Sequence, residues 1–123
     1  MVVDEGTEQE VDRLFHAMAD ATRRDILQRC TGDGLSVTRL AAAYPMSFAA
    51  VHKHVDVLAR AGLVRRQRRG REQLVHTEHD GLRQLRQALD DLERTWRARA
   101  DRMSDLLAEP GHRTPNTDGG QRR

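Results

Sequence analysis

Arginine is the residue type whose spacing in this chain indicates a definite binding chemistry. Six arginines lie between positions 60 and 71 with no acidic residue among them, whereas the first ten residues carry four acids. The net charge of the 123-residue chain is only +2, so the basic charge is local rather than general. Clustered guanidinium groups bind phosphate oxygens, and such a cluster is typical of a surface that meets nucleic acid.

Residues suited to catalysis or metal binding are few and scattered. Cys30 is the single cysteine, and one thiol can form neither an internal disulfide nor a thiolate cage for a soft metal. His52 and His54 point in different directions on a helix, and His76 and His79 flank the end of a predicted hairpin. No nucleophile–base pair, phosphate-binding glycine loop or carboxylate pair stands at a recognisable spacing. We therefore predict no enzyme, no bound metal and no cofactor.

Hydrophobic spacing predicts the elements that position the arginines. Four helices are expected before the cluster, over residues 8–18, 21–30, 37–43 and 47–61. Asp20, Ser36 and Ser47 are expected to cap the last three, because their side chains accept backbone N–H groups. Cys30 falls on the inward side of the second helix. It is expected to be a buried structural thiol, with a redox switch as the alternative.

A hairpin and a long helix are expected to follow. Two short strands, over 63–68 and 72–77, flank a tight turn at Arg69-Gly70-Arg71. A last helix, capped by Asp80, is expected from residue 82 to about 108. The fold class is therefore mainly α with a small β-hairpin, in the order expected of a winged helix-turn-helix protein with a long C-terminal dimerisation helix.

The short third helix, the turn at Pro45 and the amphipathic fourth helix match a helix-turn-helix, which places its second helix in the major groove. One face of that helix anchors in the core through Val51, Val55 and Leu58. The opposite face has small or polar side chains that are predicted to meet DNA, namely Ser47, Ala49, Ala50, His52 and Lys53. On an isolated helix these would be ordinary solvated positions, but the basic hairpin directly downstream favours DNA binding.

The arginine-rich hairpin is typical of a wing that reaches a groove or the neighbouring backbone. Like charges on paired strands repel one another unless a polyanion lies nearby. We expect the arginines around the tip to bind phosphate, namely Arg66, Arg68, Arg69 and Arg71.

The last helix carries an apolar stripe with the three-four spacing of a helix–helix seam, broken only by Arg99. The stripe consists of Leu82, Leu85, Leu89, Leu92, Trp96, Met103 and Leu106. This helix runs on the order of 40 Å at 1.5 Å per residue, longer than a domain of this size needs to cover its own core. We therefore predict a homodimer, with the alternative that the stripe only covers its own domain. Two recognition helices about one DNA turn apart would read an inverted repeat.

Four segments together resemble the ArsR family of bacterial regulators over residues 11–107. They are LFHAMADATRRDIL at 14–27, SVTRLA at 36–41, MSFAAVHKHV at 46–55 and LARAGLV at 58–64. The resemblance implies a dimeric winged-helix repressor that binds a short inverted repeat near its own promoter and often leaves DNA when an inducer binds. Ala21 replaces a proline common in the family, and His52 replaces a frequent serine, which implies a different base preference.

The resemblance also bears on sensing. Many members of the family bind metals through a cysteine pair in the third helix, or through histidines and acids on the last one. Here residues 37–43 contain no cysteine and residues 82–108 contain no histidine. Both sensing sites are therefore missing, and the identity or existence of an inducer stays open.

We expect one winged helix-turn-helix domain over 10–108, between a flexible acidic N-terminus at 1–9 and a disordered tail at 109–123. No apolar stretch is long enough to span a membrane, and the start is unlike a secretory signal. A single cysteine fits a reducing compartment, so we expect a cytoplasmic bacterial protein.

Two functions of different kinds are compatible with these features. The first is a sequence-specific regulator of double-stranded DNA, acting as a homodimeric repressor that occludes a promoter. The alternative is a winged-helix adaptor that binds another protein without operator-specific DNA binding. Phe48 is the only large apolar side chain on the fourth helix that would serve the adaptor.

Overall fold

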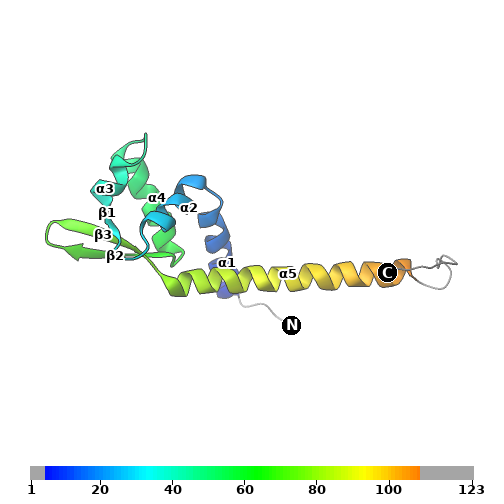
Figure 1. The fold of residues 1–123 in the computed structure, drawn as a ribbon. Coiled ribbons are helices and arrows are strands. Elements are labelled where there is room, and N and C mark those ends of the chain that lie inside the picture. Colours follow the sequence, from blue (N-terminus) through cyan, green and yellow to red (C-terminus); the bar gives the residue numbers. More distant parts are fainter. Residues whose placement is uncertain (1–4, 109–123) are drawn as a thin grey trace. The chain divides into compact units, whose positions relative to one another are not determined.

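The computed structural model describes residues 5–108. The first four residues of the N-terminus that was expected to be flexible, and the tail 109–123 that was expected to be disordered, lie outside this range. The elements are α1 Glu5–Met18, α2 Ala21–Arg29, β1 Leu35–Ser36, α3 Val37–Ala42, α4 Phe48–Arg60, β2 Val64–Arg69, β3 Glu72–Thr77 and α5 His79–Leu107 (Figure 1). The predicted class, mainly helical with a β-hairpin, is confirmed. Within this range no helix is long and apolar enough to cross a membrane.

The chain divides between Ala88 and Leu89 into two structural units. The first unit contains α1 to β3 and the beginning of α5, and the second contains the remainder of α5. Helix α1 starts at Glu5, so residues 5–9, expected to be flexible, are helical instead. The helix begins earlier than predicted for two reasons. Each residue that extends an anchored helix adds one hydrogen bond, and acidic residues are favoured near a helix N-terminus.

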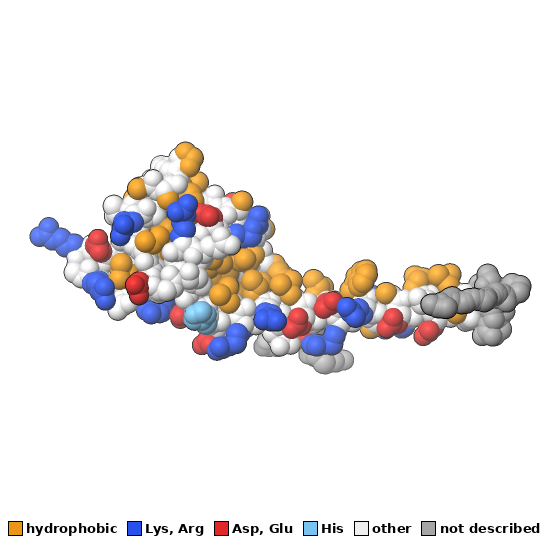
Figure 2. Space-filling model, viewed as in Figure 1, with side chains coloured by type: hydrophobic (Ala, Val, Ile, Leu, Met, Phe, Trp, Pro, Cys, Tyr) orange, Lys and Arg blue, Asp and Glu red, His pale blue; other side chains and the backbone are white. Residues whose placement is uncertain are grey.

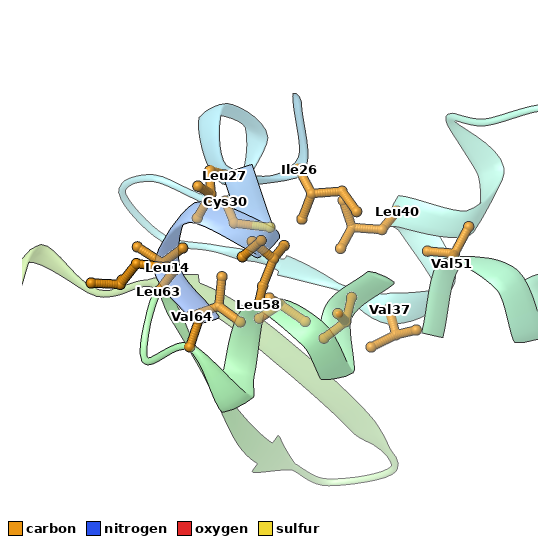
Figure 3. Packing of buried hydrophobic residues seen from close by; sticks show 14 of the residues in the cluster. Leu14, Ile26, Leu27, Cys30, Val37, Leu40, Val51, Leu58, Leu63 and Val64 are labelled. Atoms are coloured by element: carbon orange, nitrogen blue, oxygen red, sulfur yellow. The ribbon is translucent and has the colours of Figure 1, made fainter. Parts of the chain in front are cut away.

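Helices α1 to α4 and the sheet enclose one apolar core in the first unit. Its largest fully buried side chains are Ile26, Leu40, Leu58, Leu63, Val51, Val55, Val75 and Cys30. Figure 3 shows Ile26 of α2 and Leu40 of α3 pointing toward one another. The inward positions predicted for Cys30 at the end of α2 and for Val51, Val55 and Leu58 on α4 are confirmed.

A buried arginine joins α1, α2 and α4. Arg23 is only 9% exposed. Its Nε donates to the carbonyl oxygen of Ala17 at 2.9 Å and its Nη2 to that of His16 at 2.9 Å. Its Nη1 lies 3.2 Å from Nδ1 of His54 on α4. The last carbonyls of a helix lack partners within it, so Arg23 supplies the C-terminal cap of α1 from α2.

The three predicted N-caps of α2, α3 and α4 are confirmed. Asp20, Ser36 and Ser47 each accept the backbone N–H of the residue three positions on, at 3.1 Å. Asp80 is not a cap, because α5 begins at His79 and places Asp80 inside its first turn. The first carbonyl of that helix is Glu78, which accepts the N–H of Leu82 at 3.2 Å.

The start of α5 is set by a close approach of two backbones. A Cβ atom at Gly81 would overlap the carbonyl oxygen of Gly62, in the turn that follows α4. Glu78 N–H also donates to the carbonyl oxygen of Leu63 at 2.8 Å. These contacts fix the chain between β3 and α5, so the helix begins three residues earlier than its apolar spacing suggested.

The sheet is antiparallel with the strand order β1-β3-β2. Val64 pairs with Thr77 at its base and Arg69 with Glu72 at the tip, which confirms the predicted hairpin to within one residue at each end. Gly70 has φ of 62°, the left-handed conformation that a two-residue hairpin turn requires. Strand β1 was not predicted. It is only two residues long and pairs Leu35 with Val75, far along the chain.

We predict that Arg23→Met lowers the free energy of unfolding by about 2–4 kcal/mol, because the carbonyl oxygen of Ala17 and Nδ1 of His54 lose the donors that Arg23 supplies. Arg24→Met is the matched control. Arg24 is exposed and donates one hydrogen bond, to Met18 at 2.6 Å, so its removal is expected to cost less than about 1 kcal/mol. Urea denaturation followed by circular dichroism measures both. Equal destabilisation of the two variants would refute the structural role of Arg23.

We also predict that Cys30 resists alkylation in the folded protein. Burial raises the pKa of its thiol to about 11, so at pH 8 roughly one thiol in a thousand is ionised. Iodoacetamide labelling read by mass spectrometry is unambiguous, since the chain has a single cysteine. Labelling is expected to become fast only in denaturing urea. Rapid labelling of the native protein would contradict the buried structural thiol and favour the redox switch.

Candidate nucleic-acid interface

The turn between α3 and α4 is tied to α2 through Tyr44. Its hydroxyl donates to Oδ2 of Asp25 at 2.6 Å, and Nε of Arg29 donates to the same oxygen at 2.7 Å. The hydrogen bonds from Tyr44 and then Arg29 lower the pKa of the Asp25 carboxyl group. The Arg29 guanidinium also lies over the Tyr44 ring, 5.6 Å from its centroid. The turn, and with it the beginning of α4, is therefore held by a charged anchor as well as by the core.

Helix α4 places the five residues predicted to meet DNA at its N-terminal end and on its outward side. Ser47, Ala49 and Lys53 are exposed, whereas Ala50 and His52 are half-buried. The Ser47 oxygen accepts the N–H of Ala50, which leaves its own O–H free to donate to a phosphate oxygen. Within residues 5–108, Lys53 forms no ion pair. The structure thus gathers these side chains on one end of the helix.

Asp56 is a part of this surface that the sequence reasoning missed. Its carboxylate accepts a hydrogen bond from Nη1 of Arg66 on β2, and its Oδ2 lies 3.7 Å from Nδ1 of His52. The hydrogen bond from Arg66 holds the pKa of Asp56 below its usual value. Periodicity places Asp56 on the outward side of α4, but only the tertiary fold shows that it joins this helix to the wing.

The wing arginines have different surroundings. Cross-strand register places Arg66 and Arg68 on the same face of β2 as the buried Val64, and Arg65 and Arg69 on the other. Arg66 pairs with Asp56, and Arg65 pairs with Glu78 at 3.4 Å. Because both of these charges are partly compensated, the positive charge at the tip comes mainly from the other arginines.

Three arginines surround the tip of the β2–β3 hairpin. Arg68, Arg69 and Arg71 are exposed, and Figure 2 shows basic side chains at this end of the molecule. Arg68 donates from Nε to the carbonyl oxygen of Gly70 at 3.3 Å, which steadies the turn. None of the three forms an ion pair within the described part of the chain. They are the arginines best placed to meet an external anion.

The stripe predicted for a dimer seam is divided between the two units. Leu85 is buried and Leu82 half-buried, and both pack against the core of their own unit. The other predicted residues are exposed on the second unit, namely Leu89, Leu92, Trp96, Met103 and Leu106. Leu107, which was not predicted, is exposed as well. The spacing correctly identified an apolar stripe but did not show which part of it the chain covers itself.

Among residues 5–108, no three His, Cys, Asp or Glu side chains lie close enough together to hold a metal ion. The surface formed by α4 and the wing combines hydrogen-bond donors, cations and small side chains with the carboxylate of Asp56 and the exposed ring of Phe48. Its exposed cations and hydroxyl donor are groups of the kind that bind phosphate oxygens.

Comparison with known proteins supports this description. A profile described as a Helix-turn-helix domain matches residues 18–67, which contain α2, α3, α4 and most of β2. The HTH-type transcriptional regulator Rv2034 of Mycobacterium tuberculosis is 34% identical over 108 residues, which cover 88% of this chain and 98% of that protein. Both comparisons include the predicted recognition helix.

Solved structures show the same fold. The ArsR-like transcriptional regulator from Rhodococcus sp. RHA1 has a TM-score of 0.69 and 29% identity, over 82% of this chain and 95% of that one. A second solved structure is the homodimeric winged helix-turn-helix DNA-binding domain Mb0332 from Mycobacterium bovis. It has 20% identity and a TM-score of 0.59, over 95% of this chain and 100% of that one. At this identity the match shows the fold alone. These relatives are regulators rather than enzymes. The chain therefore belongs to the ArsR-like family of winged helix-turn-helix transcriptional regulators.

Proposed function

We propose that this chain is a homodimeric repressor that binds an inverted-repeat operator in double-stranded DNA and blocks a promoter. The observation that supports it best is the link between α4 and the wing. Asp56 and Arg66 join α4, whose N-terminal half has small and polar side chains, to the hairpin whose tip carries three arginines without an ion pair. One surface thus offers both a helix for the major groove and cations for the flanking phosphates.

The proposed contacts differ in what they contribute. Ala49 and Ala50 let the helix backbone approach the base edges, and Lys53 reaches a phosphate or a guanine. Ser47 stands at the helix N-terminus, where the macrodipole favours an anion. Arg68, Arg69 and Arg71 bind phosphates without reading sequence. On this division α4 supplies specificity, and the wing supplies affinity that depends on salt.

Dimerisation is proposed from the second unit. Every described residue from Leu89 to Ala108 is exposed, and six of them are large apolar side chains. Exposed apolar side chains at three-four spacing are typical of a helix that packs on another helix. The related domain Mb0332 is homodimeric. A second copy of this chain is therefore the partner we propose, and two copies would present two recognition helices to an inverted repeat.

Repression is the mode of regulation that we propose. The described residues form one winged helix-turn-helix unit and one helical unit. Occlusion of a promoter needs only occupancy of the site. The adaptor alternative has one observation in its favour, the exposed ring of Phe48 at the beginning of α4.

Binding to DNA is the direct test. We expect fluorescence anisotropy to show tight binding to the duplex upstream of the gene and weaker binding to a scrambled duplex. In Arg68→Ala/Arg69→Ala, affinity is expected to fall for both duplexes. The slope of log K against log salt is expected to be smaller by about 2, since each phosphate that the protein no longer neutralises reduces it by about 0.9.

The matched control removes the same charge elsewhere. Arg83→Ala/Arg86→Ala changes two exposed arginines of α5 in the first unit and is expected to leave the slope unchanged. Equal slopes in the wing variant and the wild type would remove the wing from the interface. No binding to either duplex at low salt would overturn the proposed function and favour the adaptor.

Placing a charge in the apolar stripe tests the dimer. We predict that Leu89→Glu converts a dimer into a monomer in sedimentation velocity, because an unpaired carboxylate would have to be buried in the seam. Gln84→Glu adds the same charge at an exposed position off the stripe and is expected to leave the dimer intact. A Leu89→Glu protein that still sediments as a dimer would place the interface elsewhere.

A further inference from the structure

Phe48 is the exposed side chain that the core and the dimer seam leave unexplained. Among residues 5–108, the large hydrophobic side chains that are well exposed all lie on α5, with the single exception of Phe48. It is 53% exposed and is the first residue of α4, directly after the cap Ser47. A partner that covered this ring would gain the free energy of burying it.

The ring has a defined position beside the predicted DNA contacts. Its centroid lies 6.1 Å from that of His52, one turn further along α4, with the two planes tilted by 41°. Ala49 is its neighbour in the chain and is exposed. The N-terminal residues of a recognition helix are those that reach base edges, and Phe48 is the largest side chain at this end.

We propose that Phe48 contacts the C5 methyl group of a thymine in the major groove, so that each half-site of the operator contains thymine at the matching position. This inference rests on the proposed function. A phenyl ring has no hydrogen-bond donor or acceptor, so it reads neither guanine nor adenine through their polar edges. Thymine alone presents an apolar group in the major groove, and aromatic and other apolar side chains contact it there.

The surroundings of the ring favour DNA over an apolar protein partner. Ser47 has a free O–H donor at the helix N-terminus, Lys53 is exposed on the same helix, and the wing arginines lie on the hairpin that Asp56 joins to α4. These groups complement phosphate. An apolar protein partner would have to bury them without their hydration, which costs free energy. The side chain of Phe48 is also longer than those of Ala49 and Ala50, the neighbouring residues predicted to meet DNA.

Replacing thymine by deoxyuridine tests the contact, since the change removes the methyl group and leaves base pairing unaltered. The probe is the shortest duplex that the wild-type protein prefers over a scrambled one, with deoxyuridine placed at each thymine in turn. We expect one position in each half-site to weaken wild-type binding about four-fold, the effect of about 0.8 kcal/mol for one buried carbon group. Phe48→Ala is expected to bind both duplexes equally at that position.

Two further variants separate the contact from a general reduction in affinity. Arg68→Ala is expected to weaken binding to the thymine and deoxyuridine duplexes alike and so to keep the four-fold ratio. Phe48→Leu keeps an apolar side chain and is expected to retain part of the preference for the thymine duplex over the deoxyuridine duplex. Because Phe48 is half-exposed, its variants should fold normally, which thermal unfolding followed by circular dichroism verifies.

The remaining outcomes overturn the inference in distinguishable ways. Wild-type protein that prefers its duplex over the scrambled one but ignores every deoxyuridine would refute the methyl contact and leave the proposed function standing. A four-fold ratio that survives in Phe48→Ala would assign the methyl group to another side chain. No preference for any duplex over the scrambled one would refute both the inference and the proposed function.

Discussion

The buried guanidinium of Arg23 is the interaction on which the arrangement of the first three long helices depends. A cation in a protein interior is tolerated only where hydrogen bonds replace its hydration, and Arg23 has partners on α1 and on α4. An arginine has donors only, so Nδ1 of His54 is the acceptor in this contact. The same group therefore ends α1 and joins α2 to α4 through His54.

A second charged contact acts on the other side of α4. The Asp56–Arg66 pair lies at the surface, where ion pairs contribute roughly 0–1 kcal/mol, so its effect on stability is small. It joins α4 to the hairpin at the surface, beside the apolar core that packs the same two elements together. Tyr44 and Asp25 hold the beginning of the helix in the same way. The interface is thus positioned by a few polar contacts around an apolar core.

The features that sequence predicted are those determined locally. The helices and the caps Asp20, Ser36 and Ser47 follow from periodicity and from side chains that bond three residues ahead. Strand β1 escaped prediction because two residues have no detectable period and their partner strand is distant in the chain. The role of Asp56 was not predicted because its partner, Arg66, lies on another element. Leu85 was assigned to a dimer seam because periodicity identifies an apolar face without saying whether the same chain or a second copy covers it.

The contact of Gly81 with Gly62 has a consequence for engineering the protein. Replacing a glycine inside a helix by alanine ordinarily raises stability by up to about 1 kcal/mol, because alanine has the best helix propensity. At Gly81 the added methyl group would overlap the Gly62 carbonyl oxygen and force the start of α5 away from the end of α4. The substitution that a propensity table recommends first would therefore separate the two backbones whose approach fixes where the last helix begins.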